Sequence, residues 1–142
     1  MSKGNTFEND LLKLIFNGTT IANIADDAAI GPLTNLDVSL HTAAPGEAGD
    51  QTTSECAYTS YARVAVARTS GGWTVTANSV SPAANITFPA ATGGSETATH
   101  WAVGTVVSGV GKLLYHGTVS LPIIISTSVT PVLTTASTIT EE

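Results

Sequence analysis

The stretch LDVSLH at residues 36–41 decides the fold class of this chain. Its apolar and polar residues alternate with a period of two, which predicts a β-strand with one face in a hydrophobic core and the other in solvent. Short apolar segments follow along the chain, and turns that contain Gly or Pro separate them, with no helical pattern in between. That order excludes a parallel α/β fold, in which helices separate the strands. We therefore expect a mainly β protein, an antiparallel β-sandwich. A jelly-roll-like strand order is favoured because the strand count is near eight, and an immunoglobulin-like sandwich is the alternative.

The segments downstream of this strand predict a series of short strands. Residues 61–68 and 73–76 are expected to form a hairpin, because Ser70-Gly71-Gly72 between them is a turn sequence. A polar loop at residues 42–59 precedes the hairpin, and a loop of this length in a small domain is usually functional or flexible. Further strands are expected at residues 85–88, 99–107, 112–116, 117–125 and 129–139.

A helical pattern covers residues 5–17. Asn5 or Thr6 can cap this helix, and Gly18 can end it in a left-handed conformation. A helix this short is marginal by itself, so we expect it to dock, by default on the protein's own sheet. The sequence thus predicts an N-terminal arm or helix at residues 1–18 and a single β-sandwich domain at residues 19–142. Four apolar residues of the helix fall on one stripe, namely Phe7, Leu11, Leu14 and Ile15.

Charged residues are scarce in this chain. It has 5 basic and 11 acidic residues among 142, well below the usual share of about a quarter. Thr, Ser, Ala, Val and Gly take their place, which is compatible with large surfaces that other subunits cover. The net charge of −6 and the scattered basic residues argue against nucleic acid as a partner. No apolar segment approaches the length of about 20 residues that a membrane span needs, and no targeting segment is expected.

No group of residues has the spacing of a catalytic or metal site. His41, His100 and His116 lack a second His or Cys at metal-ligand spacing, so we expect surface or sheet-edge positions for them. Cys56, the single cysteine, is expected to be a small buried or half-buried residue. The segment SGVGK at residues 108–112 lacks the spacing of a phosphate-binding loop. We therefore expect no enzymatic activity, no cofactor and no metal, and a small glycan hydrolase is the least favoured function.

Several blocks of sequence carry a resemblance to a known family. They are VSLHTAAPGEAG at 38–49, YTSYARVAVAR at 58–68, WTV at 73–75 with NSVSP at 78–82, and FPA at 88–90 with GG at 93–94. With these blocks the chain resembles a family of small structural proteins from tailed bacteriophages and prophages, whose members are often labelled tail-fibre-like. The resemblance spans most of the chain.

This resemblance implies a structural role in a virus particle. Because the chain is short and lacks a coiled-coil heptad run, the favoured expectation is a capsid decoration, or cement, protein. Such a protein would be a homotrimer that binds the major capsid protein on the outer surface of the head and stabilises contacts between capsid subunits. It would be made in the host cytoplasm. The alternative is a tail, neck or fibre-associated virion protein involved in attachment.

Candidate contact residues follow from the helical pattern and from composition. Residues 1–16 are a candidate arm that reaches a neighbour, and the 43–57 loop is a candidate contact loop. Tyr and Arg are enriched at protein interfaces. The candidate interface residues are therefore the helical stripe of Phe7, Leu11, Leu14 and Ile15, together with Tyr58, Tyr61, Arg63 and Arg68.

Overall fold

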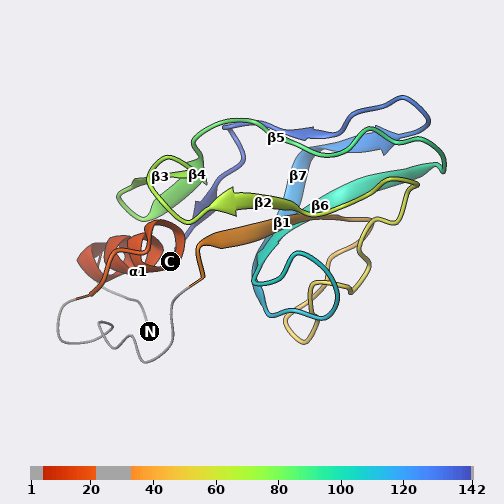
Figure 1. Cartoon of the computed structure of the whole chain (residues 1–142). Helices are drawn as coiled ribbons and strands as arrows, with labels where there is room; N and C mark the ends of the chain where they lie inside the picture. Colours follow the sequence, from red (N-terminus) through yellow and green to blue (C-terminus); the bar gives the residue numbers. More distant parts are fainter. Residues whose placement is uncertain (1–4, 22–32, 142) are drawn as a thin grey trace. The chain divides into compact units, whose positions relative to one another are not determined.

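The computed structural model describes residues 5–21 and 33–141 of the chain (Figure 1). All strand pairs with a defined register are antiparallel, so the predicted mainly β, antiparallel fold class is confirmed. The jelly-roll strand order stays a prediction. The elements are α1 (Asn5–Asn17), β1 (Asn35–His41), β2 (Val64–Ala67), β3 (Trp73–Thr76), β4 (Ser79–Pro82), β5 (Ile86–Thr87), β6 (Glu96–Gly104), β7 (Leu113–Ile125), β8 (Val132–Leu133) and β9 (Ile139–Thr140).

The chain folds into two compact units, each made of more than one segment. Unit 1 comprises Met1–Asn35, Val66–Asn85 and Thr134–Glu142, and unit 2 comprises Leu36–Ala65 and Ile86–Leu133. Unit 1 holds α1 and a three-stranded sheet of order β3-β4-β9. Unit 2 holds most of β1, the strands β6 and β7, and the β5–β8 pair. The division into residues 1–18 and 19–142 stays a prediction.

Helix α1 begins and ends at the predicted residues, Asn5 and Asn17. Gly18 follows with a φ of 64°, a left-handed conformation that glycine adopts without steric cost. The N–H of Thr19 then donates to the carbonyl of Lys13 at 3.1 Å, so the chain turns back over the last turn of the helix. The sequence therefore predicts both the end of the helix and the residue that ends it.

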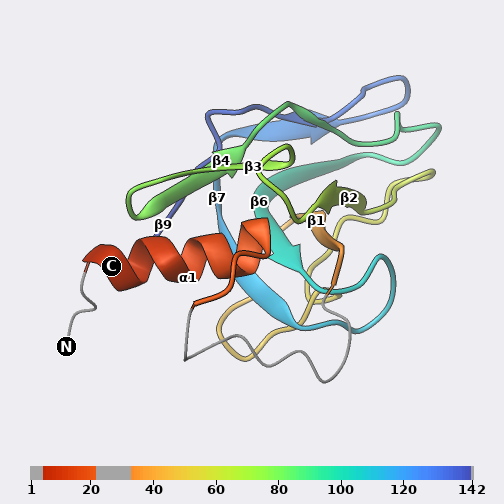
Figure 2. The same cartoon turned by 60° about the vertical axis from the view of Figure 1, so that its left-hand side comes forward.

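Helix α1 packs on the hairpin of β3 and β4 within unit 1, as Figure 2 shows. Leu12, Phe16 and Trp73 are fully buried in this contact region. The rings of Phe16 and Trp73 meet edge-on, with centroids 4.7 Å apart. Burying a side chain of this kind stabilises a fold by about 1.5–3 kcal/mol. The expectation that the helix docks on the protein's own sheet is therefore confirmed.

The hairpin expected between residues 61–68 and 73–76 is wrong. β3 pairs with β4, with Trp73 opposite Pro82 and Thr76 opposite Ser79, whereas β2 belongs to the four-stranded sheet. The turn between β3 and β4 contains Ala77, whose φ is 52°. A period of two in the sequence indicates which faces of a strand are buried, but it does not identify the strand's partner.

The four-stranded sheet has the order β2-β1-β6-β7. Every residue of β1 after the first is buried, so both faces of this central strand are covered. The prediction that Asp37, Ser39 and His41 face solvent is therefore wrong. Residues of the loop that follows β1 bond to this polar face, so side chains that alternate with the core residues are also removed from water.

Strand β7 is one continuous strand of 13 residues, where the sequence predicted two shorter ones. It pairs with β6 along most of its length, and the register of the ladder shifts twice, between Ala98 and His100 and between Val103 and Gly104. Ala98 lies opposite Ile123 and His100 lies opposite Thr118, so residues 119–122 form a bulge. Pro122 lies inside this bulge, where the ladder requires no N–H. Bulges are positions at which strands tolerate proline.

Candidate interaction surface

The long loop between β1 and β2, residues 42–63, is held in place by four side chains of unit 2. We call these residues the loop anchor, and they are Gln51, Glu55, Arg63 and Glu96. Gln51 and Arg63 are buried, and Glu55 and Glu96 are half-buried. Their hydrogen bonds give a loop without strands a defined conformation, although a loop of this length is usually expected to be mobile.

Gln51 joins this loop to the turn between β6 and β7. Its Oε1 accepts the N–H groups of Thr105 at 2.9 Å and Val106 at 3.1 Å, and its Nε2 donates to the Val106 carbonyl at 3.2 Å. Two glycines make room for it, because a Cβ at Gly104 would lie 2.0 Å from Cδ of Gln51 and one at Gly111 would lie 2.1 Å from Oε1. The amide therefore fills a space that only glycine leaves open.

Arg63 and Glu55 form a bidentate ion pair. Arg63 Nε donates to Glu55 Oε1 and Nη2 donates to Oε2, each at 2.7 Å, and Nη1 donates to the Val106 carbonyl at 2.9 Å. The hydrogen bond to Glu55 raises the pKa of Arg63 above its usual value. The side chains are only 2% and 15% exposed, so the pair is screened weakly by water.

Asp37 lies near this ion pair with its Oδ1 buried and without a hydrogen-bond partner. Burial raises the pKa of Asp37, and the positive charge of Arg63 opposes that rise. The carboxylate therefore depends on Arg63 for compensation of its charge.

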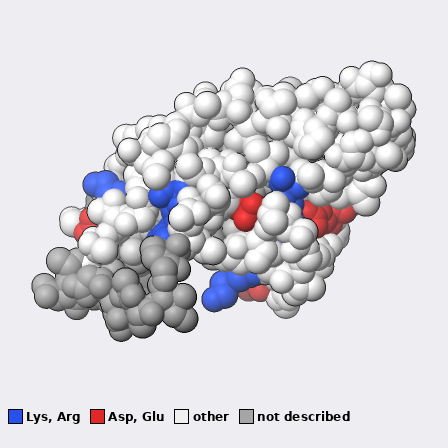
Figure 3. All heavy atoms as spheres, viewed as in Figure 1, with Lys and Arg blue, Asp and Glu red and all other residues white. Residues whose placement is uncertain are grey.

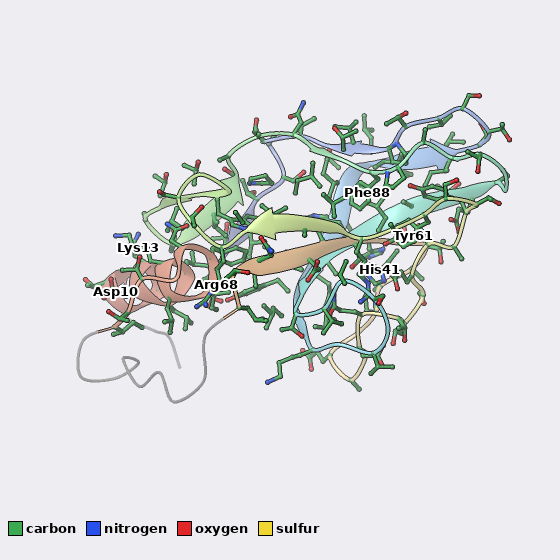
Figure 4. All side chains as sticks on the ribbon, viewed as in Figure 1. Asp10, Lys13, His41, Tyr61, Arg68 and Phe88 are labelled. Carbon is green, nitrogen blue, oxygen red and sulfur yellow. The ribbon has the colours of Figure 1, made fainter. Side chains whose placement is uncertain are left out.

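An aromatic cluster lies beside the ion pair, and Figure 4 labels two of its members. The ring of Tyr61 stacks on Phe88 with centroids 6.4 Å apart, and it meets Tyr58 edge-on at 5.2 Å. The Tyr61 hydroxyl donates to Glu55 Oε1 at 3.0 Å and accepts the Leu40 N–H at 3.1 Å. Burial and the nearby Glu55 charge raise the pKa of Tyr61 far above its usual value, so its hydroxyl stays protonated.

Glu96 fixes the far end of the loop. Its Oε1 accepts the N–H groups of Ala57 at 2.8 Å and Tyr58 at 2.6 Å, and the Tyr58 hydroxyl donates to the Pro89 carbonyl at 2.8 Å. Burial raises the pKa of Tyr58 to about 12. A carboxylate that accepts backbone N–H groups in this way orders the chain that carries them.

Cys56 is buried, as the sequence predicts. Burial, followed by the charges of Glu96 and Glu55, raises the pKa of its thiol to about 12. Because the thiolate is the nucleophilic form of cysteine, this residue is unsuited to nucleophilic chemistry.

His41 lies in the central strand and is fully buried, so the expected surface or sheet-edge position is wrong for it. Its Nδ1 lies 2.9 Å from the Thr53 carbonyl, and its Nε2 lies 2.8 Å from Ser39 Oγ. A carbonyl only accepts, so Nδ1 carries the proton and Nε2 accepts from the serine hydroxyl. Burial lowers the pKa of His41, and the neutral ring joins the loop to the polar face of β1.

Across residues 5–21 and 33–141, no group of three or more His, Cys, Asp or Glu side chains could hold a metal ion. Two carboxylates of the 42–63 loop have other partners. Asp50 Oδ1 accepts the N–H and the hydroxyl of Thr52 at 2.7 Å and 2.6 Å, and these bonds lower the pKa of Asp50. Glu55 binds Arg63. Asp50 and Glu55 therefore order the loop itself.

The predicted interface residues are spread over both units. Tyr58 and Arg63 are buried and Tyr61 is half-buried in unit 2. Arg68 is in unit 1, where its guanidinium donates to carbonyls at the end of α1, among them that of Ile15 at 2.5 Å. Leu11, Leu14 and Ile15 are half-buried; the side chain of Phe7, and residues 1–4 of the predicted arm, lie outside the described part of the chain. Contact of these residues with a partner stays a prediction.

Sequence reasoning missed Gln51 and Glu96 as structural anchors. Both lie next to turn residues, and their partners are mainly backbone groups far along the chain. Local spacing carries no signal for such bonds. The only sequence signal for Gln51 is the presence of Gly104 and Gly111, which becomes interpretable only once the three residues are known to meet.

The chain is poor in charge from residue 69 to residue 140, a stretch that contributes to both units. Between residues 69 and 140 only Glu96 and Lys112 are charged. Figure 3 shows the consequence, because the spheres above β5 and at the upper right of the view carry no charged side chain. The only buried residue of β7 is Ile125, and Leu121 and Ile124 are 78% and 73% exposed. We call the side of β7 that faces away from β6 the neutral edge.

These features define a small antiparallel β protein whose buried polar side chains bond to one another and whose longest strand is uncharged. A family model described as podophage GP4 fiber I protein gp80 matches residues 2–140. The chain belongs to this family and is a phage virion structural protein of fibre type. No curated protein matches the sequence. No helix in the described part of the chain is long and apolar enough to cross a membrane.

Proposed function

We propose that this chain is a structural subunit of a phage fibre, held in the particle by packing of its uncharged β surface against neighbouring subunits. The observation that carries the proposal is the match to a fibre protein family over residues 2–140. The charge-poor stretch between residues 69 and 140 supports it, because the cores of protein interfaces are depleted of charged residues.

The loop anchor supports the same function through preorganisation. Gln51, Glu55, Arg63 and Glu96 hold the 42–63 loop with hydrogen bonds made inside unit 2. Ordering a flexible loop on binding costs about 0.5–1.5 kcal/mol for each immobilised side chain. A loop that is already ordered avoids that cost, which suits a protein that has to fit a repeating assembly.

The position and number of copies in the particle test this proposal. Cryo-electron microscopy of purified particles, together with mass spectrometry of the copy number relative to the major capsid protein, gives both quantities. The proposed function predicts density in a fibre and a few to a few tens of copies. Density over the shell with hundreds of copies contradicts it.

A capsid cement protein is the second candidate function. The observation that favours it is compactness, because α1 has 13 residues and no longer helix occurs in residues 5–21 and 33–141. A coiled-coil fibre shaft needs a sustained heptad pattern. In this case a homotrimer would bind the major capsid protein on the outer surface of the head, and the copy-number measurement separates the two functions.

A further inference from the structure

The two edges of the four-stranded sheet differ in how they are protected from other chains. The edge strand β2 has four residues and is followed directly by Arg68. Short length and charge are devices by which proteins keep an edge strand from pairing with another chain. The opposite edge strand, β7, has 13 residues and contains no Asp, Glu, Lys or Arg. The usual strand length is about 5–6 residues, so β7 is a long, uncharged edge strand among the residues that the structure describes.

The part of β7 before its bulge is the part that can pair. Residues 113–118 form the first half of the ladder with β6, and alternate residues of an edge strand direct their N–H and carbonyl groups away from the neighbouring strand. Pro122 has no N–H and lies in the bulge. The proline therefore stops an added strand near residue 119 and limits pairing to one short register.

Charge selects the occupant of this edge. The chain has a net charge of −6, so two copies repel each other over most of their surface. In a two-fold pairing each strand meets its own sequence in reverse, and a charged residue near the axis would lie opposite or diagonally across from its own copy. A strand with no charged residue avoids this repulsion, and the exposed Leu121 and Ile124 add apolar area on both copies.

We propose that the neutral edge pairs with the neutral edge of a second copy of this chain, antiparallel and about a two-fold axis. The pairing joins two four-stranded sheets into one, and it satisfies the outward backbone groups of both β7 strands. A symmetric contact of this kind closes on itself and does not extend into a filament. This inference rests on the proposed function for the location of the chain in the particle. It identifies the partner of the uncharged β surface as a second copy of the chain.

The test is the molar mass of the purified chain, measured by light scattering over a range of concentrations. The native chain should reach twice its mass of 14.4 kDa. Thr118→Lys places a charge on the paired part of the neutral edge at an exposed position, and it should raise the dissociation constant by about tenfold or more, which corresponds to about 1.4 kcal/mol. Val110→Lys is the matched control, since Val110 is 76% exposed in the turn before β7, and it should leave the dimer unchanged.

Hydrogen exchange supplies a second readout that does not depend on mass. Alternate amides of residues 113–119 should be protected in the native dimer and lose that protection in Thr118→Lys, while circular dichroism shows that the variant remains folded. A monomer at every concentration, a trimer, or a dimer that Thr118→Lys leaves intact overturns the proposal. Because the measurement uses the isolated chain, its failure leaves the fibre location to be decided by imaging of the particle.

Discussion

Arg63 makes three charge-assisted hydrogen bonds within unit 2. It binds both oxygens of Glu55 and the Val106 carbonyl, and its charge also compensates that of Asp37. A buried pair of this kind is weak evidence of net stabilisation, because both charges lose their hydration. Its clear consequence is that the buried groups depend on one another, because removal of one charged partner leaves the charges of the others uncompensated.

Arg63→Met should therefore destabilise the protein by about 3–5 kcal/mol, the range for breaking a buried pair from one side. Chemical denaturation measures this free energy of unfolding. Lys112→Met is the control, because it removes the same charge with the same replacement at an exposed position, and it should change stability by less than about 0.5 kcal/mol. If Arg63→Met costs no more than Lys112→Met, the ion pair does not hold the loop.

His41 predicts a dependence of stability on pH. Burial lowers its pKa, and the nearby charges of Arg63 and His100 act in the same direction, while Glu55 and the bond to Thr53 oppose them. The folded state therefore prefers the neutral ring. The stabilisation is complete above the unfolded pKa of about 6.5 and is lost as the pH falls below it towards the lowered folded value.

We expect the free energy of unfolding to fall between about pH 7.5 and about pH 5, and His41→Gln should flatten that fall even if it lowers stability overall. His116→Gln removes an exposed histidine and should keep the slope of the native chain. Equal slopes for native protein and His41→Gln would show that another group carries the pH dependence.

At the scale of elements, the 42–63 loop and the β6–β7 turn form one structural element through Gln51. Neither segment has regular secondary structure to stabilise it, and Gln51 provides three hydrogen bonds between them. The space for its side chain comes from Gly104 and Gly111. Glycine is used here because a neighbouring side chain occupies the position of a Cβ.

This arrangement predicts a coupling between residues 51 and 111. Gly111→Ala should displace the Gln51 side chain and destabilise the protein by about 1–3 kcal/mol, the cost of unsatisfied buried polar groups. In a Gln51→Ala background the same change should cost less, because of these neighbours only Val106 Cγ2, 2.3 Å from the added Cβ, remains, and a double-mutant cycle measures the difference. Gly117→Ala is the control, since a Cβ there has no atom within 4 Å; additive energies for residues 51 and 111 would contradict the coupling.

At the scale of the whole molecule, charge is unevenly distributed along the chain. Twelve of the charged residues lie in the first 68 positions, and the 72 positions from 69 to 140 hold two. The neutral edge belongs to this second part. Association through it should therefore depend on apolar contact and backbone pairing, with no contribution from ion pairs.

The dimer should accordingly not weaken when salt is raised from about 0.05 M to about 0.5 M, a range over which exposed ion pairs are screened. Sulfate should strengthen it, because this ion increases the effective burial of apolar surface. Sedimentation equilibrium at each salt concentration measures the dissociation constant. A tenfold weakening with salt would mean that charged groups hold the two copies together.

The sequence by itself determined the features that depend on neighbours along the chain. The limits of α1, its end at Gly18 and the antiparallel β class all follow from spacing, capping and turn residues. The buried state of Cys56 follows from residue type. The family blocks pointed in the same way to a phage structural protein, which the match over residues 2–140 supports.

Only the tertiary structure decided which strands pair and which polar residues are buried. The partner of β3 is β4, the polar face of β1 is covered, and Gln51 meets glycines more than 50 positions away. The physical reason is that hydrogen bonds and steric fit between distant segments depend on distances in space, and a local pattern of residues does not contain them. Burial of the β1 histidine, the loop anchor and the exposed edge of β7 are consequences of those distant contacts.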